Sequence, residues 1–185
     1  SFLKDRMGEQ VFPDNIRIID DPHRPRGAAS KPFDGEGVVN KRLDLVKGGT
    51  LQSWILNTSS AKQLGLRTNG RATRGTASPP GSGTTNLYME AGNLSLEELI
   101  GDIKSGLFIT SLIGFGVNAI TGDYSRGASG FWIENGEMAF PVSELTIAGN
   151  LNDMFMKLTP ADDLEFRQGT NAPSLRIDGM MVAGT

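Results

Sequence analysis

The sequence predicts an α+β fold, mainly antiparallel β-sheet with two or three short helices. Its 24 glycines lie between short apolar runs, which favours many turns and short strands. Lys47-Gly48-Gly49 and Asn135-Gly136 connect strand-like runs, as is typical of hairpins. Ser95-Leu-Glu-Glu98 is a capping box, which opens a helix. We therefore expect one domain over residues 1–185, long enough to bury a substantial core.

The first elements of the chain are expected to be short strands joined by loops. Arg17 to Asp20 is a short β-branched run, and the arm that follows it to Gly37 is rich in Pro, Gly and Ala. Val38 to Leu45 is expected to pair with Thr50 to Thr58 across the glycine turn between them. These residues therefore predict one hairpin after an extended, loop-dominated arm.

A helical turn and a long loop are expected next. Ser60 to Leu64 predicts a helical turn that ends at Gly65, where glycine can adopt the left-handed conformation of a helix end. Thr68 to Thr85 contains Gly, Ser, Thr and Pro without an apolar period, which is typical of a long surface loop.

The second half is expected to contain two capped helices and several strands. The capping box at Ser95 predicts a helix to about Lys104–Gly106, and Asn150 can cap a short helix over Leu151–Leu158. Asn135-Gly136 predicts a tight type I′ hairpin turn. The expected strands are Asn86–Ala91, Phe108–Asn118, Gly130–Glu134, Glu137–Phe140 and Leu175–Val182, the last broken at Asp178-Gly179.

Composition excludes several classes of protein. The net charge is −3 and the pI about 5.2, so the average field disfavours nucleic acid as a partner. The absence of cysteine excludes disulfides, thiolate nucleophiles and sulfur-based zinc sites. The longest apolar stretch, Gly106 to Ile120, is interrupted by polar residues and is shorter than the ~20 residues that span a bilayer. We expect no membrane segment.

The residues assemble no catalytic centre and no metal site. His23 is the only histidine and lies between Pro22 and Pro25, which indicates a structural or solvent-exposed role. Asp20-Asp21 and Asp162-Asp163 lack the interleaved spacing of a calcium loop and are typical of solvated turns. We name no catalytic and no metal-binding residue.

The segment from Thr121 to Gly130, TGDYSRGASG, is the first candidate binding site. It combines an acid, a tyrosine, a serine and an arginine with glycines that permit close backbone approach. A polypeptide or an anion could bind there; the alternative is a glycine-rich crossover whose polar groups satisfy its own backbone. The candidate peptide-binding residues are Asp123, Tyr124, Ser125, Arg126, Gly127 and Gly130.

The second candidate is the segment Gly70 to Gly75, GRATRG. Arg71 and Arg74 lie among glycines and could surround a phosphate or a carboxylate. The segment lacks the Gly-Lys-Ser/Thr ending of a Walker loop. A mobile surface loop is therefore the favoured interpretation of both arginines, with binding by the same loop as the alternative.

Two adjacent segments carry a family signature. Ala119 to Glu137 reads AITGDYSRGASGFWIENGE and Pro141 to Asn150 reads PVSELTIAGN. Both closely resemble the PmbA/TldE branch of the TldD/PmbA family. Further matching features run along nearly the whole chain, at Ala29–Asp34 with Glu36–Gly37, Trp54–Thr58, Ser60–Ala61 with Leu64–Leu66, and Leu175–Gly184.

The resemblance implies a cytoplasmic bacterial protein that serves as the noncatalytic partner of a zinc-bearing TldD-type subunit. The pair would form a metalloprotease that acts on unfolded or small peptides. Residues 1–185 would be a C-terminal domain, with the family's upstream α/β region absent from this chain. The family name also implies an alternative, a protein-interaction module that regulates DNA gyrase or a related partner without proteolysis. Isolated from its partner, the chain could form a homo-oligomer.

One departure from the TldD type concerns the metal. TldD-type chains offer a cysteine ligand, whereas the corresponding region here, Glu165 to Gly169, has none. The resemblance therefore implies no cofactor in this chain and zinc in the TldD-type partner. Asp123 to Gly130 is the expected wall of the peptide cleft, presenting strand edges to an extended peptide.

Overall fold

The computed structural model describes residues 1–184 and has an α+β fold with three short helices and mostly antiparallel sheets. The chain divides into two compact units. Unit 1 comprises Ser1–Pro13, Ala91–Asp163 and Ser174–Thr185, and unit 2 comprises Asp14–Glu90 and Leu164–Pro173. Each unit is therefore built from segments that are distant in the sequence.

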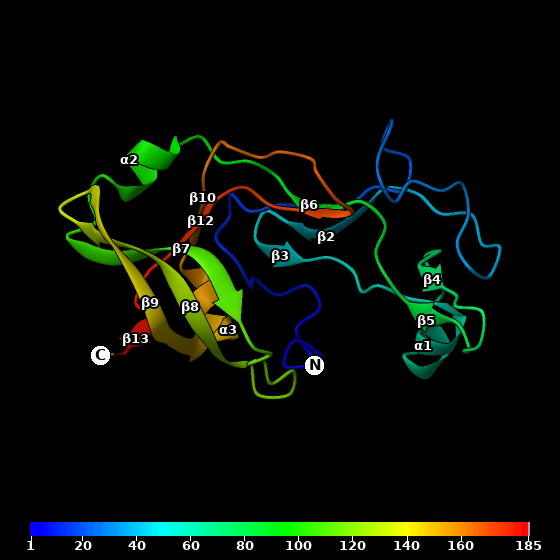
Figure 1. The fold of residues 1–185 in the computed structure, drawn as a ribbon. Helices are drawn as coiled ribbons and strands as arrows, with labels where there is room; N and C mark the ends of the chain where they lie inside the picture. The colour runs from blue at the N-terminus through cyan, green and yellow to red at the C-terminus, as the bar shows by residue number, and fades with distance from the viewer. Residues whose placement is uncertain (185) are drawn as a thin grey trace. The chain divides into compact units, whose positions relative to one another are not determined.

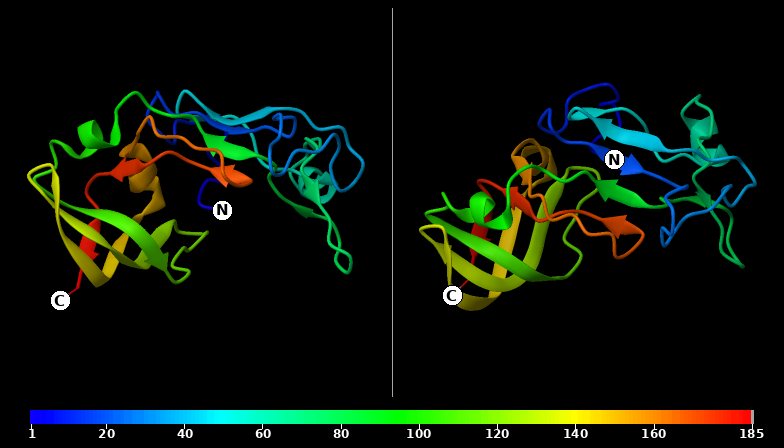
Figure 2. Two further views of the ribbon diagram at one scale, coloured as in Figure 1. Left: turned by 45° about the horizontal axis from the view of Figure 1, so that its top comes forward. Right: turned by 90° about the horizontal axis from the view of Figure 1, so that it is seen from above.

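Unit 2 is centred on a five-stranded sheet of order β11-β6-β1-β2-β3. Figure 2 shows β1 and β2 in blue and cyan beside β6 in green, in agreement with their antiparallel pairing. Only β11 joins in the parallel sense, against β6. Ile16, Ile19, Val46 and Leu51 are buried and form the core. The strands are β1 (Ile18–Asp20), β2 (Leu43–Lys47), β3 (Thr50–Leu51), β6 (Leu87–Met89) and β11 (Thr170–Asn171).

The expected hairpin turn in unit 2 is confirmed, because β2 pairs with β3 across Gly48 and Gly49, which have φ values of 57° and 70°. The paired strands are shorter than predicted. The expected helical turn is α1 (Thr58–Gln63), and Gly65 follows it with φ 66°. The expected long loop over residues 68–85 is more ordered than predicted, since β4 (Ala72–Thr73) pairs with β5 (Gly81–Ser82).

Unit 1 contains a four-stranded antiparallel sheet of order β13-β9-β8-β7. β7 (Ser105–Ile113), β8 (Asp123–Glu134) and β9 (Glu137–Asn150) are the long strands in green to yellow in Figure 1. The predicted turn between β8 and β9 is confirmed, because Asn135 and Gly136 both have positive φ, 51° and 83°. The remaining elements are α2 (Leu96–Ile100), α3 (Leu151–Met156), β10 (Leu158–Pro160), β12 (Leu175–Ile177) and β13 (Met181–Ala183).

Local sequence signals fix the two helices of unit 1. The Ser95 hydroxyl accepts from Glu98 N at 3.2 Å, and the Glu98 carboxylate accepts from Ser95 N at 2.8 Å. This capping box confirms the start of α2, which ends at Ile100 rather than near Lys104. The Asn150 side chain caps α3 by accepting from Asn152 N at 3.1 Å. Within residues 1–184, no helix is long and apolar enough to cross a bilayer.

Two predicted strands of unit 1 differ from the observed ones. The strand expected at Gly130–Glu134 begins at Asp123, so the glycine-rich stretch before Gly130 is sheet and not a crossover loop. Leu175–Val182 forms two strands in separate sheets, β12 against β10 and β13 against β9, with Gly179 turning between them at φ 77°.

Candidate functional site

The six predicted peptide-binding residues lie in β8, which has hydrogen-bonded neighbours on both sides. Ser125 to Gly127 pair with Thr146–Ala148 of β9. On the other side Gly127 pairs with Ile113, and Ser125 N donates to the carbonyl of Gly116 at 2.7 Å. Because these backbone groups are already paired, the prediction that Asp123–Gly130 presents a free strand edge is wrong. Peptide binding by their side chains stays a prediction.

The Asp123 carboxylate is held in a defined position at the start of β8. It accepts a hydrogen bond from Thr121 Oγ1 at 2.6 Å and from Asn150 Nδ2 at 3.1 Å. The Thr121 hydroxyl, followed by the Asn150 amide, lowers the pKa of Asp123 below its ordinary value. The exposed carboxylate is therefore an ordered anion that remains charged at neutral pH.

Arg126 and Gly130 hold β8 against its neighbour β7. Arg126 Nη2 donates to the carbonyl of Leu112 at 3.4 Å. A Cβ on Gly130 would lie 1.9 Å from the carbonyl oxygen of Phe108, so only glycine permits this approach of the two strands. Gly130 is thus a packing requirement of the sheet.

The sheet of unit 1 has two long edges without a strand partner in the described part of the chain. One is β7, and the other is the first part of β9, because β13 covers only Thr146–Ala148. The β9 edge carries Glu137, Pro141 and Glu144, and Glu144 has φ 58°. Charges, proline and irregular backbone are the usual features that prevent strand addition. The β9 edge is therefore protected.

The β7 edge has neither charge nor proline, and its backbone irregularity is a single register shift against β8 between Ile109 and Ser111. No charged residue and no proline occurs from Ser105 to Gly122. Ile113 is 69% exposed, and Phe115 in the following loop is fully exposed. A long, uncharged and apolar edge is a template for another extended chain. The candidate functional site is therefore the outer edge of β7, which we call the β7 edge.

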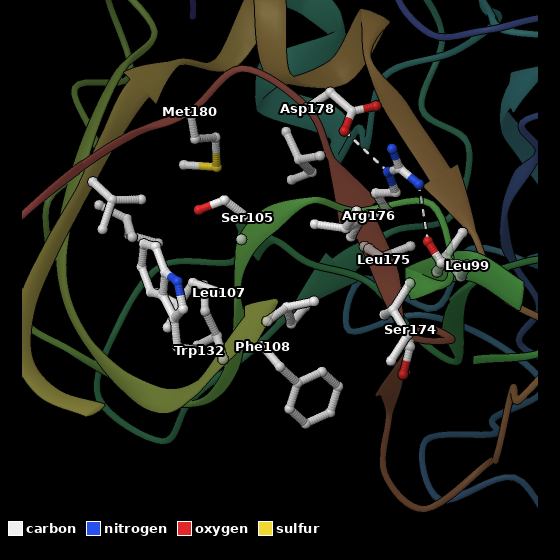
Figure 3. Close-up of a pocket in the computed structure, with 18 of the residues that line it drawn as sticks. Leu99, Ser105, Leu107, Phe108, Trp132, Ser174, Leu175, Arg176, Asp178 and Met180 are labelled. Carbon is white, nitrogen blue, oxygen red and sulfur yellow. Dashed lines mark hydrogen bonds and ion pairs between the residues drawn. The ribbon is translucent and has the colours of Figure 1, made fainter. Parts of the chain in front are cut away.

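A pocket of about 390 Å³ adjoins β7 within unit 1. Figure 3 shows Trp132, Leu107 and Met180 on one side and Leu99, from α2, near Leu175 on the other. Phe108 and Ile109 also line the pocket. The lining is predominantly aliphatic and aromatic, so the pocket suits an uncharged apolar side chain.

The basic group of this pocket, Arg176, is already neutralised. Its Nη1 donates to the Leu99 carbonyl at 3.0 Å and pairs with Asp102, and its Nε donates to Asp178 at 2.9 Å. Asp102, followed by Asp178, raises the pKa of Arg176 above its ordinary value. Arg176 therefore joins α2 to β12 and is not an open anion-binding group.

The second predicted site does not form. Arg71 is fully buried, and its Nε donates to the carboxylate of Asp20, which is also fully buried. The interpretation of Arg71 as a residue of a mobile surface loop is wrong, because its guanidinium pairs with a carboxylate 51 residues away. The interpretation of Asp20 as a turn acid is wrong for the same reason. Arg74 is exposed, as expected.

The described residues offer no metal site. Within residues 1–184, no three His, Cys, Asp or Glu side chains lie close enough to hold a metal ion. His23 Nε2 lies 2.9 Å from Asn40 Oδ1, and the Asp163 carboxylate accepts from Ser174 N and Oγ, both at 2.7 Å. These two candidate ligands are therefore engaged in contacts with neighbouring side chains and backbone.

The β7 edge and its pocket were missed by the sequence analysis. The available signal was the run from Ser105 to Gly122 without charge or proline, which predicted a strand over Phe108–Asn118 but not an open edge. The location of this run at an open edge follows from its pairing with β8, which local sequence does not determine.

The chain is similar to known proteins over its whole length. The model of the PmbA/TldA metallopeptidase C-terminal domain matches residues 1–184. Metalloprotease PmbA of Escherichia coli O157:H7 is 44% identical over 185 residues, which cover 100% of this chain and 39% of that protein. A metalloprotease PmbA homolog of Haemophilus influenzae is 42% identical over 187 residues, with the same coverages, 100% and 39%.

Solved structures agree with this similarity. A candidate modulator of a DNA gyrase from Thermotoga maritima matches with a TM-score of 0.86 and 35% identity, covering 99% of this chain and 42% of that one. TldE from Thermococcus kodakarensis matches with a TM-score of 0.86 and 25% identity, covering 98% and 42%. The chain thus spans about two fifths of the length of the relatives it matches.

Proposed function

Because the chain belongs to the PmbA/TldA metallopeptidase C-terminal domain family, we propose that it acts in a TldD/TldE-type metalloprotease as the noncatalytic partner subunit. In this role it helps to form the cleft that binds unfolded or small peptides. The zinc and the catalytic residues belong to a TldD-type subunit, and the complex works in the cytoplasm.

The observation that carries the proposal is the unprotected β7 edge. An extended peptide that pairs with Ser105–Ile113 would gain backbone hydrogen bonds, which depend little on the peptide's sequence. Unfolded peptides differ widely in sequence but share the same backbone. An edge that recognises backbone is therefore suited to this class of substrate.

The pocket adds a preference to this backbone recognition. In strand addition, side-chain pockets next to the edge read alternate residues of the bound peptide. Leu107, Phe108 and Ile109 belong both to β7 and to the pocket lining. A peptide on the β7 edge would therefore lie close to a pocket that favours an apolar side chain.

Peptidase activity of the reconstituted pair tests this proposal. The full-length protein alone, a TldD-type subunit alone and their mixture are assayed on an unstructured peptide. We expect cleavage only by the mixture. Cleavage by the full-length protein alone would contradict the assignment of a noncatalytic role.

A second candidate function follows from the names of two similar structures. Those of Thermotoga maritima and Bacteroides thetaiotaomicron, 35% and 31% identical, are named for modulation of DNA gyrase. The alternative is a protein-interaction module that regulates gyrase or a related partner without proteolysis. Capture of purified gyrase in the absence of any TldD-type subunit would favour it, and a failure of capture would remove it.

A further inference from the structure

The two units of the chain carry opposite charge. Unit 2 has twelve Lys or Arg and eight Asp or Glu residues, which gives +4. Unit 1 has six basic and thirteen acidic residues, which gives −7, and the two values together account for the net charge of −3. The net charge of the whole chain is therefore negative although unit 2 has a net positive charge.

The structure increases this asymmetry at the surface of unit 2. Asp20 and Asp34 are buried, and Asp44 and Glu90 form ion pairs with Arg17. Many basic residues of unit 2 are exposed and form no ion pair within residues 1–184. They are Arg26, Lys41, Lys47, Lys62, Arg67 and Arg74. Asp20, Asp34, Asp44 and Glu90 are therefore buried or paired, whereas these six bases face solvent.

One arginine of unit 2 stacks on an exposed aromatic ring, and further basic residues lie near these two residues in the sequence. The Cζ of Arg24 lies 3.6 Å from the centroid of the Phe166 ring, and Tyr88 packs edge-on against the same ring at 5.1 Å. Arg26 and Lys31 belong to the same loop as Arg24, and Arg167, which pairs with Glu165, follows Phe166. We call Arg24, Arg26, Lys31, Phe166 and Arg167 the Phe166 cluster.

The backbone around the cluster is held by hydrogen bonds. The carbonyl of Arg24 accepts from Gly27 N at 3.0 Å and from Ser30 Oγ at 2.7 Å. The buried Asn86 side chain accepts from Ala29 N at 3.0 Å and donates to Ser30 Oγ at 2.9 Å. The loop is therefore a fixed scaffold, on which ordering the basic side chains costs less than on a mobile one.

The guanidinium groups of Arg24 and Arg26 are open to a ligand. Arg24 contacts the face of Phe166, and neither side chain donates a hydrogen bond to any residue that the structure describes. A guanidinium stacked on a ring keeps its N–H fork available for a carboxylate. The stacked Arg24 and the exposed Arg26 thus offer two guanidinium groups on one loop to a ligand with several carboxylates.

We propose that the Phe166 cluster binds acidic segments of extended peptides. This inference deepens the proposed function by naming a class of peptide, and it rests on that function only for its biological use. Charge complementarity favours an acidic ligand, and the planar guanidinium fork matches the carboxylates of Asp and Glu side chains. A short peptide can neutralise the cluster alone.

Fluorescence anisotropy with a labelled ten-residue peptide tests the proposal. One peptide alternates Glu with Gly and Ser, and its partner has Gln at each Glu. We expect the full-length protein to bind the Glu peptide about tenfold more tightly at low salt, with a strong loss of affinity at high salt. Equal binding of the two peptides would overturn the proposal.

Paired variants distinguish binding at the Phe166 cluster from general electrostatic attraction by the positive charge of unit 2. Arg24→Gln with Arg26→Gln is compared with Lys47→Gln plus Lys62→Gln, which removes the same charge from the same unit. We expect about tenfold weaker binding for the first pair and less than about twofold for the second. Equal losses would overturn the site, as would tighter, cluster-dependent binding of a single-stranded oligonucleotide of equal charge. Because no protease partner is needed, this result is independent of the peptidase assay.

Discussion

Arg71 donates from its Nε to the carboxylate of Asp20, and solvent reaches neither side chain. Asp20 also accepts from Thr85 N at 2.6 Å and from Thr85 Oγ1 at 2.9 Å. Arg71 Nη2 donates to the Lys41 carbonyl at 2.7 Å. The pair thus joins β1, which carries Asp20, to the segments that carry Arg71 and Lys41. Each buried charge is compensated by the opposite charge of its partner.

Removal of Arg71 should strongly destabilise the protein. Arg71→Met leaves the carboxylate of Asp20 buried without its counter-charge, and we expect a loss of about 3–5 kcal/mol in the free energy of unfolding. Urea denaturation measures it. Arg74→Met is the control, since Arg74 is exposed and should change stability by less than about 0.5 kcal/mol. Equal effects of the two variants would show that Arg71 has no structural role.

Two glycines of β8 should differ sharply in their tolerance of alanine. A Cβ at Gly130 meets the Phe108 carbonyl oxygen at 1.9 Å, whereas a Cβ at Gly127 meets Ile113 Cβ at an ordinary 3.5 Å. Gly130→Ala should therefore separate β7 from β8 and cost more than about 3 kcal/mol, while Gly127→Ala should stay within about 1 kcal/mol of the parent. Thermal unfolding followed by circular dichroism compares them, and a tolerated Gly130→Ala would contradict the observed strand pairing.

Asp34 should make the stability of unit 2 depend on acid pH. Burial raises the pKa of this carboxyl, but the N–H groups of Ala72, Val38 and Glu36 outweigh burial and lower the pKa below 3.8. Since the folded pKa lies below the unfolded one, the contribution to stability is present above pH 3.8 and is lost as the pH falls through the folded pKa.

Urea denaturation at a series of pH values measures this contribution. Asp34→Asn should be less stable than the parent at pH 7, and the difference should shrink as the pH falls below 3.8. Asp5→Asn changes an exposed acid and serves as the control. A difference between Asp34→Asn and the parent that stays constant from pH 7 to pH 3 would rule out the linkage.

The helix cap at Ser95 should contribute measurably to unit 1. Ser95→Ala removes the acceptor of the Glu98 N–H and should cost about 1 kcal/mol. Ser95→Asp keeps an acceptor at the cap and should restore most of this loss. Chemical denaturation of both variants provides the comparison, and equal stabilities would argue against the cap.

Local features of the fold could be predicted from the sequence. The capping box at Ser95 and Glu98 and the positive φ of Asn135 and Gly136 depend on a few neighbouring residues, and the structure confirms both. The fold class follows from such signals repeated along the chain, whereas the family was identified from the resemblance of longer segments. Local chemistry therefore accounts for most of the elements.

Nonlocal features could not be predicted in the same way. The partner of Arg71 is 51 residues away, so a glycine-rich local sequence suggested a loop where a buried ion pair occurs. The glycines of Asp123–Gly130 also suggested a loop, although Gly130 permits close strand pairing. Whether β7 lies at an open edge depends on which strands pair with it. Its uncharged run therefore indicates a binding edge only once the strand order is known.

The most direct test of peptide binding along the β7 edge is the rate of peptide cleavage by the mixed subunits when this edge carries charge. Ser111→Lys with Ile113→Lys places two lysines on this edge, and Met138→Lys with Ala139→Lys places two on the protected β9 edge. We predict at least about tenfold slower cleavage at subsaturating peptide for the β7 variant, and less than about twofold change for the β9 variant. Full activity of a folded β7 variant would contradict the claim that peptides bind along this edge.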